Sequence, residues 1–351
     1  MKTIKVSAER TYNVTVDCNW LNQLTPSLAA RTRVAIVHSV AMRDRFKGLE
    51  SVDSDVHFFE VADGESAKSP KVLQSLWDWL GAAGFTRSDL IIGIGGGTIT
   101  DLAGFAAATW LRGIDWISVP TTLAGMVDAS IGGKTGINSD YGKNLIGSFH
   151  SPIEVIIDIE WLKSLSGRDF AAGLAEVVKT GFIADGAILD LLEGKSVATV
   201  RSDAQLVVEL IHRSVAVKAK VVSGDFRESF DREILNYGHT LGHAIEIHSK
   251  YELRHGEAVA IGLVFAAQLA GVKNVLDSKT IERHVQILSA LSLPVTYPRS
   301  AWDKLYPLLS LDKKSRGNTL RFVAISEVGK TLRIEDANES ELTLAYERIC
   351  S

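Results

Sequence analysis

The sequence predicts an α/β protein of two domains, a mostly parallel sheet covered by helices followed by a helical domain. Three observations predict this fold class. Short apolar runs alternate with helical patterns in the first part of the chain, and helical spacing dominates after about residue 163. The length of 351 residues is also that of about two ordinary domains. We therefore expect domains at 1–162 and 163–351.

The expected strands are short runs rich in β-branched and other apolar residues. They cover 3–7, 11–16, 33–38, 56–60, 90–94, 115–119 and 154–158. Runs that are apolar on both faces and interleaved with helices, here 69–83 and 98–110, are typical of a parallel sheet buried on both sides. Ligands of such sheets bind at the carboxyl ends of the strands.

The second domain is expected to be helical. Its helices are expected at 168–184, 202–222, 235–249, 256–272 and 277–291, with extended pieces near 319–325. Gly256, Glu257 and Gln268 interrupt the apolar stretch 256–272, so we expect no membrane span.

Composition excludes several classes of protein. The net charge of −4, with 46% hydrophobic and 23% charged residues, argues against a nucleic-acid or membrane partner and allows a small anion. Cys18 and Cys350 belong to no CxxC pair, so the sequence indicates neither a metal knuckle nor a disulfide framework. The first 16 residues contain no apolar signal core, so we expect a reducing, cytoplasmic location.

The segment LIIGIGGGTITD (90–101) combines a buried strand, three successive glycines and a helix start. Glycines allow a backbone to approach a phosphate, and a helix N-terminus offers free N–H groups at the positive end of its dipole. The segment therefore fits the pyrophosphate of a dinucleotide, and equally a tight turn without a ligand.

Two Gly-Lys pairs follow within VPTTLAGMVDASIGGKTGINSDYGKNLIG (119–147). They place Lys134 and Lys143 beside glycines in what we expect to be polar loops, with Asn144 next in sequence. Glycine lets the backbone come close to a phosphate and the ammonium supplies charge. The alternative for each lysine is a solvated surface residue.

A metal-type pattern lies in the second domain. Glu176 and Lys179 are one turn apart in an apolar helix, where a carboxylate is unfavourable unless it is paired or bound to a metal. His239 and His243 are four residues apart, the spacing that turns two imidazoles to one helix face, and His255 precedes the next helix. Spacing leaves His239/His243 and His239/His255 both open as the ligand pair. A surface ion pair and ordinary buried histidines are the simpler alternatives.

Several cations could hold an anionic substrate. Arg232 lies one turn before Asn236, Lys218 lies in an earlier helix, and LDKKSRG (311–317) is a basic turn. Each could be surface charge, and together they could bind a carboxylate and a phosphate.

At this point the chain resembles one family, 3-dehydroquinate synthase, and most closely its actinobacterial branch. The motifs are DGESAK (63–68), GGGTITDLAGFAAATWLRG (95–113), VPTTLAGMVDASIGGKTGIN (119–138), GKNLIGSFHSP (142–152), GLAEVVKTGFI (173–183), REILNYGHTLGHAIE (232–246) and RHGEAVAIGL (254–263). They occur in the family's order and spacing, and the resemblance runs from about residue 10 to 345.

The resemblance implies a Rossmann-like NAD-binding domain, a helical metal- and substrate-binding domain, and a homodimer acting on a small-molecule sugar phosphate. It implies zinc, with Co²⁺ as a possible substitute, on Glu176, His239 and His255. The catalytic residues it implies are Asp128, Lys134, Lys179, Asn236 and His243. The substrate-binding residues are Arg112, which reaches the partner subunit's site, Asn144, Lys218, Arg232 and either Lys313 or Lys314. The NAD-binding residues are Asp63, Glu65, Lys68, Gly97, Asp101, Thr121, Thr122, Lys134, Lys143 and Lys163.

The implied shikimate-pathway reaction converts 3-deoxy-D-arabino-heptulosonate 7-phosphate to 3-dehydroquinate and phosphate. It proceeds by transient NAD-dependent oxidation, phosphate elimination, re-reduction, ring opening and internal aldol closure. Alternatives are aminodehydroquinate synthase, a cyclitol synthase, a related alcohol or glycerol dehydrogenase, and an inactive metabolite-binding protein. A cyclitol synthase acting on a neutral sugar phosphate needs no carboxylate pocket, and a dehydrogenase would accumulate NADH.

The chain departs from the family pattern at three positions. Lys220 stands where the family commonly has Glu, Phe226 replaces an acidic residue, and His38 replaces a short polar or acidic residue at a strand end. We expect altered salt bridges near the substrate pocket and altered contacts to the adenosine ribose.

Overall fold

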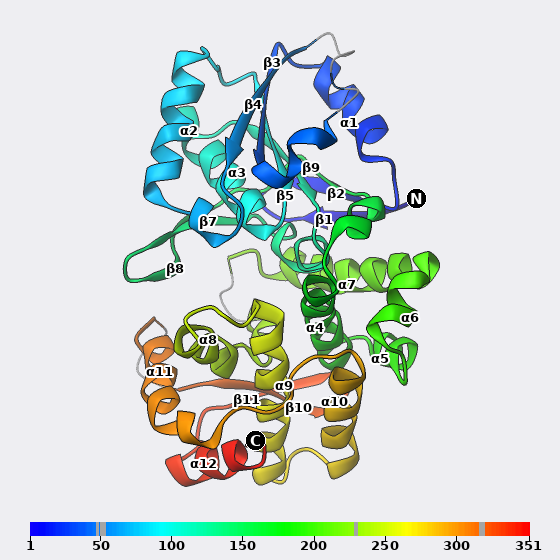
Figure 1. Cartoon of the computed structure of the whole chain (residues 1–351), viewed down its shortest axis with the longest axis vertical. Coiled ribbons are helices and arrows are strands. Elements are labelled where there is room, and N and C mark those ends of the chain that lie inside the picture. Colours follow the sequence, from blue (N-terminus) through cyan, green and yellow to red (C-terminus); the bar gives the residue numbers. More distant parts are fainter. Residues whose placement is uncertain (47–48, 50–53, 228–230, 316–319) are drawn as a thin grey trace. The chain divides into compact units, whose positions relative to one another are not determined.

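The chain divides into two compact units. A computed structural model describes residues 1–46, 49, 54–227, 231–309 and 320–351, together with the backbone of 310–315. The first unit comprises Met1–Leu165 and Lys218–Arg227, and the second comprises Ser166–Val217 and Glu228–Ser351 (Figure 1). The sequence assigned segment 218–227 to the second domain, and here the structure differs from that expectation.

A seven-stranded sheet forms the first unit, in the order β1-β2-β9-β6-β5-β3-β4. The strands are β1 (Lys2–Ser7), β2 (Thr11–Val16), β3 (Arg33–Ser39), β4 (Asp55–Val61), β5 (Leu90–Gly95), β6 (Asp115–Pro120) and β9 (Glu154–Ile157). The pair β1–β2 is antiparallel, and every other neighbouring pair is parallel. All seven expected strands are therefore present.

Three helices accompany the sheet: α1 (Trp20–Ala29), α2 (Pro70–Ala82) and α3 (Gly97–Thr109). Leu73 and Leu76 of α2 pack with Leu102 of α3 and Ile91 of β5 in one buried cluster, which is why β5 is apolar throughout. A Cβ on Gly93 would lie 2.8 Å from the Ala103 side chain, so α3 lies directly on β5. The shorter turns are η1 (Val40–Arg45), η3 (Glu65–Ala67), η4 (Trp110–Arg112), η5 (Gly125–Ala129) and η6 (Ile159–Ser164).

The expectation of polar loops around the Gly-Lys pairs was wrong. The segment forms an antiparallel hairpin of β7 (Lys134–Ser139) and β8 (Gly142–Phe149), closed between Ser139 and Gly142. A Cβ on Gly147 would lie 2.3 Å from the Thr135 carbonyl oxygen, so glycine here permits close strand pairing. Polar and glycine-rich strands lack the apolar alternation by which a strand is recognised.

The second unit is mainly helical. Its helices are α4 (Gly167–Ile183), α5 (Gly186–Leu192), α6 (Val197–Ser202), α7 (Ala204–Gly224), α8 (His239–His248), α9 (His255–Val272), α10 (Ser278–Ala290), α11 (Trp302–Ser315) and α12 (Glu339–Glu347), with the hairpin β10 (Phe322–Glu327) and β11 (Lys330–Ile334). The last residues of α7 belong to the first unit. The expected helix 235–249 is divided, because Gly238 at φ 79° separates the turn η7 (Asp231–Asn236) from α8.

Helix α9 is the core helix of the second unit. By length and composition it could cross a membrane, but 72% of that apolar window is buried among other elements of the protein. A Cβ on Gly256 would lie 1.8 Å from the Ala172 carbonyl oxygen, and one on Gly262 would lie 1.9 Å from the Gly238 carbonyl oxygen. The backbones of α4 and of Gly238, the residue immediately before α8, therefore touch α9 directly.

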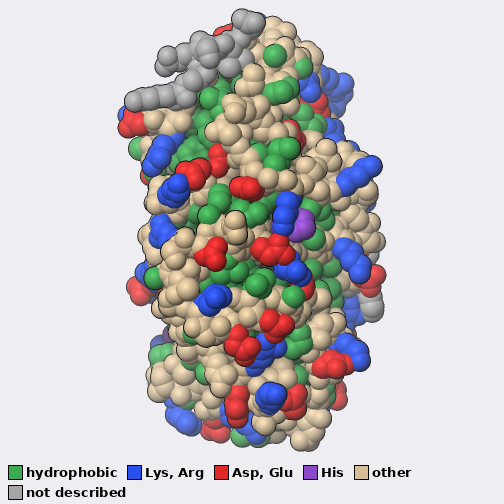
Figure 2. Space-filling view, turned by 90° about the vertical axis from the view of Figure 1, so that its right-hand side faces the viewer, with side chains coloured by type: hydrophobic (Ala, Val, Ile, Leu, Met, Phe, Trp, Pro, Cys, Tyr) green, Lys and Arg blue, Asp and Glu red, His purple; other side chains and the backbone are tan. Residues whose placement is uncertain are grey.

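The surface charges are mixed. On the face drawn in Figure 2, the described Lys and Arg side chains are interspersed with Asp and Glu. This pattern agrees with the net charge of −4.

Candidate active site

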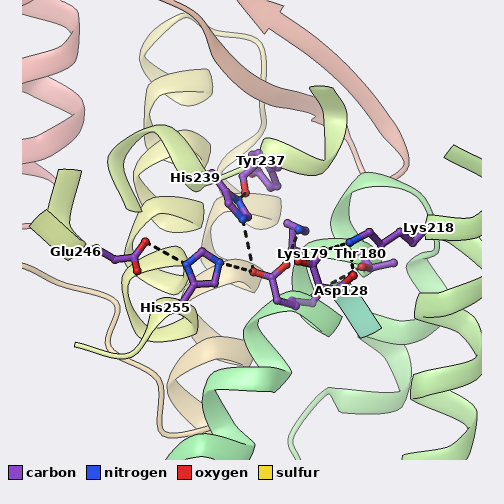
Figure 3. Close-up of polar contacts among 9 residues, drawn as sticks. Asp128, Lys179, Thr180, Lys218, Tyr237, His239, Glu246 and His255 are labelled. Atoms are coloured by element: carbon purple, nitrogen blue, oxygen red, sulfur yellow. Dashed lines mark hydrogen bonds and ion pairs between the residues drawn. The ribbon is translucent and has the colours of Figure 1, made fainter. Parts of the chain in front are cut away.

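Three side chains of the second unit meet from three helices. Glu176 lies in α4, His239 is the first residue of α8, and His255 is the first residue of α9. Their ligand atoms lie within 4.8 Å of one another. The Glu176 Oε1 atom is 3.6 Å from His239 Nε2 and 3.4 Å from His255 Nε2. Figure 3 shows both imidazoles turned toward this point. Sequence spacing left either His243 or His255 as the second histidine ligand. The structure places His255 beside Glu176.

The Glu176 carboxylate is buried and suits a metal. Glu176 is 1% exposed and Lys179, with which it forms an ion pair, is 2% exposed, so a surface ion pair is excluded. Within the described part of the chain, both carboxylate oxygens of Glu176 are buried and accept no well-oriented hydrogen bond. One carboxylate and two imidazole nitrogens are a donor set typical of catalytic zinc, which leaves a position open for substrate.

The charged groups of this cluster shift one another's pKa values. Burial raises the pKa of Glu176, but Lys179, His239 and His255 outweigh burial and hold it well below its usual range. Burial, with Lys179 nearby, lowers the pKa of His239 to about 3. Burial also lowers the pKa of His255, but the neighbouring carboxylates of Glu176 and Glu246 outweigh burial and raise the value to about 10. A metal that binds here requires the neutral form of both imidazoles.

Two supports of the cluster were missed by sequence reasoning. His255 Nδ1 is 3.1 Å from Glu246 Oε2, and His239 Nδ1 is 3.1 Å from the Tyr237 carbonyl oxygen. The Tyr237 hydroxyl in turn bonds to His284 Nε2 at 2.9 Å. Glu246 could have been found, because a carboxylate seven residues after His239 shares its helix face. His284 carries no such signal, since it is distant in sequence.

The other site residues expected in the second unit lie around η7, α8 and α11. Arg232 is 2% exposed in η7, and Asn236 is half-buried at the end of that turn. His243 is exposed on α8, with its ring 5.4 Å from that of His239. Lys313 and Lys314 belong to α11, and their side chains lie outside the described residues.

The glycine turn of the first unit begins α3. Gly97 is the first residue of α3, and its N-cap Gly96 gives the helix no side-chain cap. Thr121 N–H donates to the Gly95 carbonyl oxygen at 2.8 Å, and Thr122 Oγ1 accepts from Gly125 N–H at 3.1 Å. An uncapped helix N-terminus with glycine around it suits the phosphates of a dinucleotide.

A polar network links the 63–68 segment, α3 and the β7–β8 hairpin. Lys68 is 4% exposed, and its ammonium pairs with Asp101 at 2.6 Å and contacts Asn144 Oδ1. Glu65 accepts hydrogen bonds from Thr98 at 3.1 Å and from Asn138 at 2.7 Å. Burial raises the pKa of Asp101, although Lys68 opposes the shift.

The remaining candidates of the first unit are more dispersed. Lys218 in α7 forms an ion pair with Asp128 of η5. Asp63 accepts from the backbone N–H of Ala41 at 3.4 Å. Lys134 and Lys143 lie on the hairpin, Lys163 is exposed and pairs with Glu160 at 2.7 Å, and Arg112 is exposed in a turn at φ 69°.

The three departures from the family pattern have distinct surroundings. Lys220 is exposed on α7. Phe226 packs edge-on against Phe149 of β8, with ring centroids 5.3 Å apart. His38 is 3% exposed, and its ring lies 4.7 Å from that of Phe46. His38 is therefore buried in an aromatic cluster at the end of β3.

Comparison with known proteins identifies the family. The profile of the 3-dehydroquinate synthase N-terminal domain matches residues 58–172, and that of the C-terminal domain matches residues 173–315. The 3-dehydroquinate synthase of Thermobifida fusca is 49% identical over 343 residues, covering 96% of this chain and 93% of that protein. The chain belongs to the 3-dehydroquinate synthase family.

Solved structures of related cyclases have the same fold as this 3-dehydroquinate synthase family member. ValA, a 2-epi-5-epi-valiolone synthase from Streptomyces hygroscopicus with NAD⁺ and Zn²⁺ bound, superposes with a TM-score of 0.90 at 28% identity, covering 99% of this chain and 98% of that one. A 2-deoxy-scyllo-inosose synthase complexed with carbaglucose-6-phosphate, NAD⁺ and Co²⁺ gives a TM-score of 0.87 at 25% identity, covering 99% of each chain.

Proposed function

We propose that this chain catalyses the 3-dehydroquinate synthase reaction, converting 3-deoxy-D-arabino-heptulosonate 7-phosphate to 3-dehydroquinate and phosphate. The observation that carries the proposal is the meeting of Glu176, His239 and His255 in a chain 49% identical to a 3-dehydroquinate synthase. NAD and a divalent metal, zinc or Co²⁺, are the cofactors, as in the related cyclases solved with them.

Glu176, His239 and His255 would hold the metal, and the glycine turn at Gly97 would hold the cofactor phosphates together with the 63–68 segment. When bound, the metal supplies Lewis acidity and NAD supplies a transient hydride acceptor. Lys179 supplies a buried positive charge beside the ligand cluster. That charge favours developing negative charge on a substrate oxygen.

The cationic residues would bind the two anionic ends of the substrate. Arg232 and Lys218 would hold the carboxylate, Arg232 through its planar fork, while Asn236 would bind a hydroxyl. Lys134 and Asn144 on the hairpin, with Lys313 or Lys314, would hold the phosphate. Fixing that group favours its elimination, since a substrate phosphate oxygen held in place can act as the base. His243, exposed beside His239, would handle a proton in the later steps.

The other residues that the family resemblance assigns to NAD would also contact the cofactor. NAD would be surrounded by Asp63, Glu65, Lys68, Asp101, Thr121, Thr122, Lys143 and Lys163. Asp128 would meet the substrate as a catalytic residue. We also propose a cytoplasmic homodimer in which Arg112 reaches the partner's site; its exposed position in a left-handed turn supports this role.

A direct assay tests the reaction. The purified full chain with zinc, catalytic NAD and the heptulosonate phosphate should release phosphate and form 3-dehydroquinate in equal amounts, without accumulating NADH. Phosphate release without dehydroquinate would favour another cyclase reaction, and net NADH would favour a dehydrogenase. No product with metal and NAD both bound would refute the proposal.

A further inference from the structure

The two histidines of the proposed metal site are restrained to different degrees. The side chain of His239 is 10% exposed, and its Nδ1 bonds to the Tyr237 carbonyl oxygen. The side chain of His255 is 42% exposed, because it occupies the first position of α9. Packing alone therefore restrains the ring of His255 less than that of His239.

Glu246 supplies the restraint on the His255 ring that packing does not. Its carboxylate is 6% exposed and lies 3.1 Å from His255 Nδ1 (Figure 3). In the neutral imidazole that a metal requires, the hydrogen would reside on Nδ1, because the Glu246 oxygen that faces this nitrogen accepts. Nε2, which lies 3.4 Å from Glu176 Oε1, would then carry the lone pair that binds the metal. Contact with Glu246 thus selects both the tautomer and the ring orientation that a metal requires.

The position of Glu246 follows from helix geometry. Glu246 comes seven residues after His239 and three after His243, so all three lie on one face of α8. A Cβ on Gly242 would lie 3.3 Å from the Ala258 carbonyl oxygen, so this face of α8 packs closely on α9. Close packing of the two helices brings Glu246 to the first turn of α9.

We propose that Glu246 is a positioning residue that holds His255 in its metal-binding orientation and tautomer. The inference rests on the proposed metal site. The competing assignment makes Glu246 itself a ligand, since its carboxylate, His243 and His255 also have ligand atoms within 4.8 Å of one another. Each ring nitrogen of His255 faces a different carboxylate, so one nitrogen binds the metal while the other donates a hydrogen bond. The burial of Glu176 and His239 favours Nε2 as the metal-binding atom.

The test compares Glu246→Gln with a matched control, Glu257→Gln. Glu257 is a buried carboxylate in the first turn of α9, the helix that carries His255, where it accepts from Arg254 N–H at 2.8 Å and pairs with Arg168. Zinc affinity and stoichiometry are measured on the purified full chain by competition with a chromogenic chelator. Urea unfolding of the zinc-free protein measures stability, and absorption of the Co²⁺-loaded protein reports ligand geometry.

Wild type is expected to bind one zinc ion per chain. Glu246→Gln should bind one zinc ion about 10- to 100-fold more weakly, with a changed Co²⁺ spectrum. Glu257→Gln should lose stability and retain wild-type zinc affinity. Glu246→Asp, which restores the carboxylate, should recover part of the affinity, and this variant decides the question if Glu246→Gln does not fold.

Four results would overturn the inference. Wild-type affinity in Glu246→Gln would show that His255 needs no such support. Equal losses of stability and affinity in the Glu246 and Glu257 variants would show a merely structural role. One zinc ion in wild type and none in Glu246→Gln, even at saturating zinc, would make Glu246 a ligand. A wild-type protein that binds no zinc would refute the metal assignment in the proposed function as well.

Discussion

Gly262 of α9 contacts Gly238, which lies immediately before α8, and we predict that substituting Gly262 lowers both stability and zinc affinity. In Gly262→Ala, the new Cβ would lie 1.9 Å from the Gly238 carbonyl oxygen, where contacts below 3.0 Å do not occur. The two backbones must therefore separate by about 1 Å, a strain typical of overpacked cores. His239 follows Gly238 directly, so the same shift displaces a proposed metal ligand.

Two opposing free energies decide the sign of the stability change. Replacing glycine by alanine inside a helix alone would stabilise the protein by about 1 kcal/mol. Overpacking costs about 1–3 kcal/mol, and more when the opposing group is backbone. We therefore expect Gly262→Ala to lower the free energy of unfolding by about 1–2 kcal/mol. Zinc affinity should fall about tenfold or more, because metal–ligand distances tolerate only about 0.2 Å.

The control is Gly167→Ala at the first residue of α4, where a Cβ would meet nothing within 4 Å. Urea unfolding of the metal-free proteins and a chelator competition for zinc measure both quantities. Gly167→Ala should be neutral or slightly stabilising and should bind zinc normally. If Gly262→Ala gained stability to the same degree and kept its zinc affinity, the contact would not position His239.

Three further predictions concern the site and its pH dependence. His255→Ala should abolish zinc binding, whereas His243→Ala should keep zinc and lose catalytic rate. If His243→Ala lost the metal instead, His239 and His243 would be the histidine ligands. Arg232→Ala should raise KM sharply and lower kcat/KM with zinc and NAD still bound, and unchanged kinetics would remove it from the substrate site. Burial lowers the pKa of His284 from its usual 6.5 to about 3, so between these values the unfolded chain binds a proton that the folded chain does not. The free energy of unfolding of metal-free protein should therefore fall with decreasing pH by about 1.4 kcal/mol per pH unit more than that of His284→Gln, and equal slopes in urea titrations would contradict this.

The sheet could be predicted because its strands are buried on both faces. Runs such as LIIGIG at 90–95 are apolar at every position, and the glycines after them mark the start of α3. The hairpin at 134–149 could not be predicted, because its strands pair through close glycine contacts rather than through apolar alternation. Helices α5 and α6 are only seven and six residues long, too short for a clear helical period.

The candidate site was predictable in composition and ambiguous in geometry. Glu176 in an apolar helix and the histidines of 239–255 indicated a metal, but spacing on one helix favours His243 as strongly as His255. The choice depends on how α8 and α9 pack, and the Gly262–Gly238 contact sets that packing. Spacing places Glu246 on the helix face of His239, but its partner His255 lies on the neighbouring helix, so only the folded arrangement reveals this contact.

The buried pair of Lys179 and Glu176 has a consequence for how the protein matures. A buried carboxylate that loses its counter-ion costs about 3–5 kcal/mol, and small zinc domains unfold for related reasons when chelated. Here the Lys179 ammonium pairs with the buried Glu176 carboxylate and supplies such a counter-ion from the protein itself. We therefore expect the apoprotein to persist in its native fold and to exchange zinc for cobalt reversibly. The chain would then fold first and acquire its metal from the cell's supply as a separate, later event.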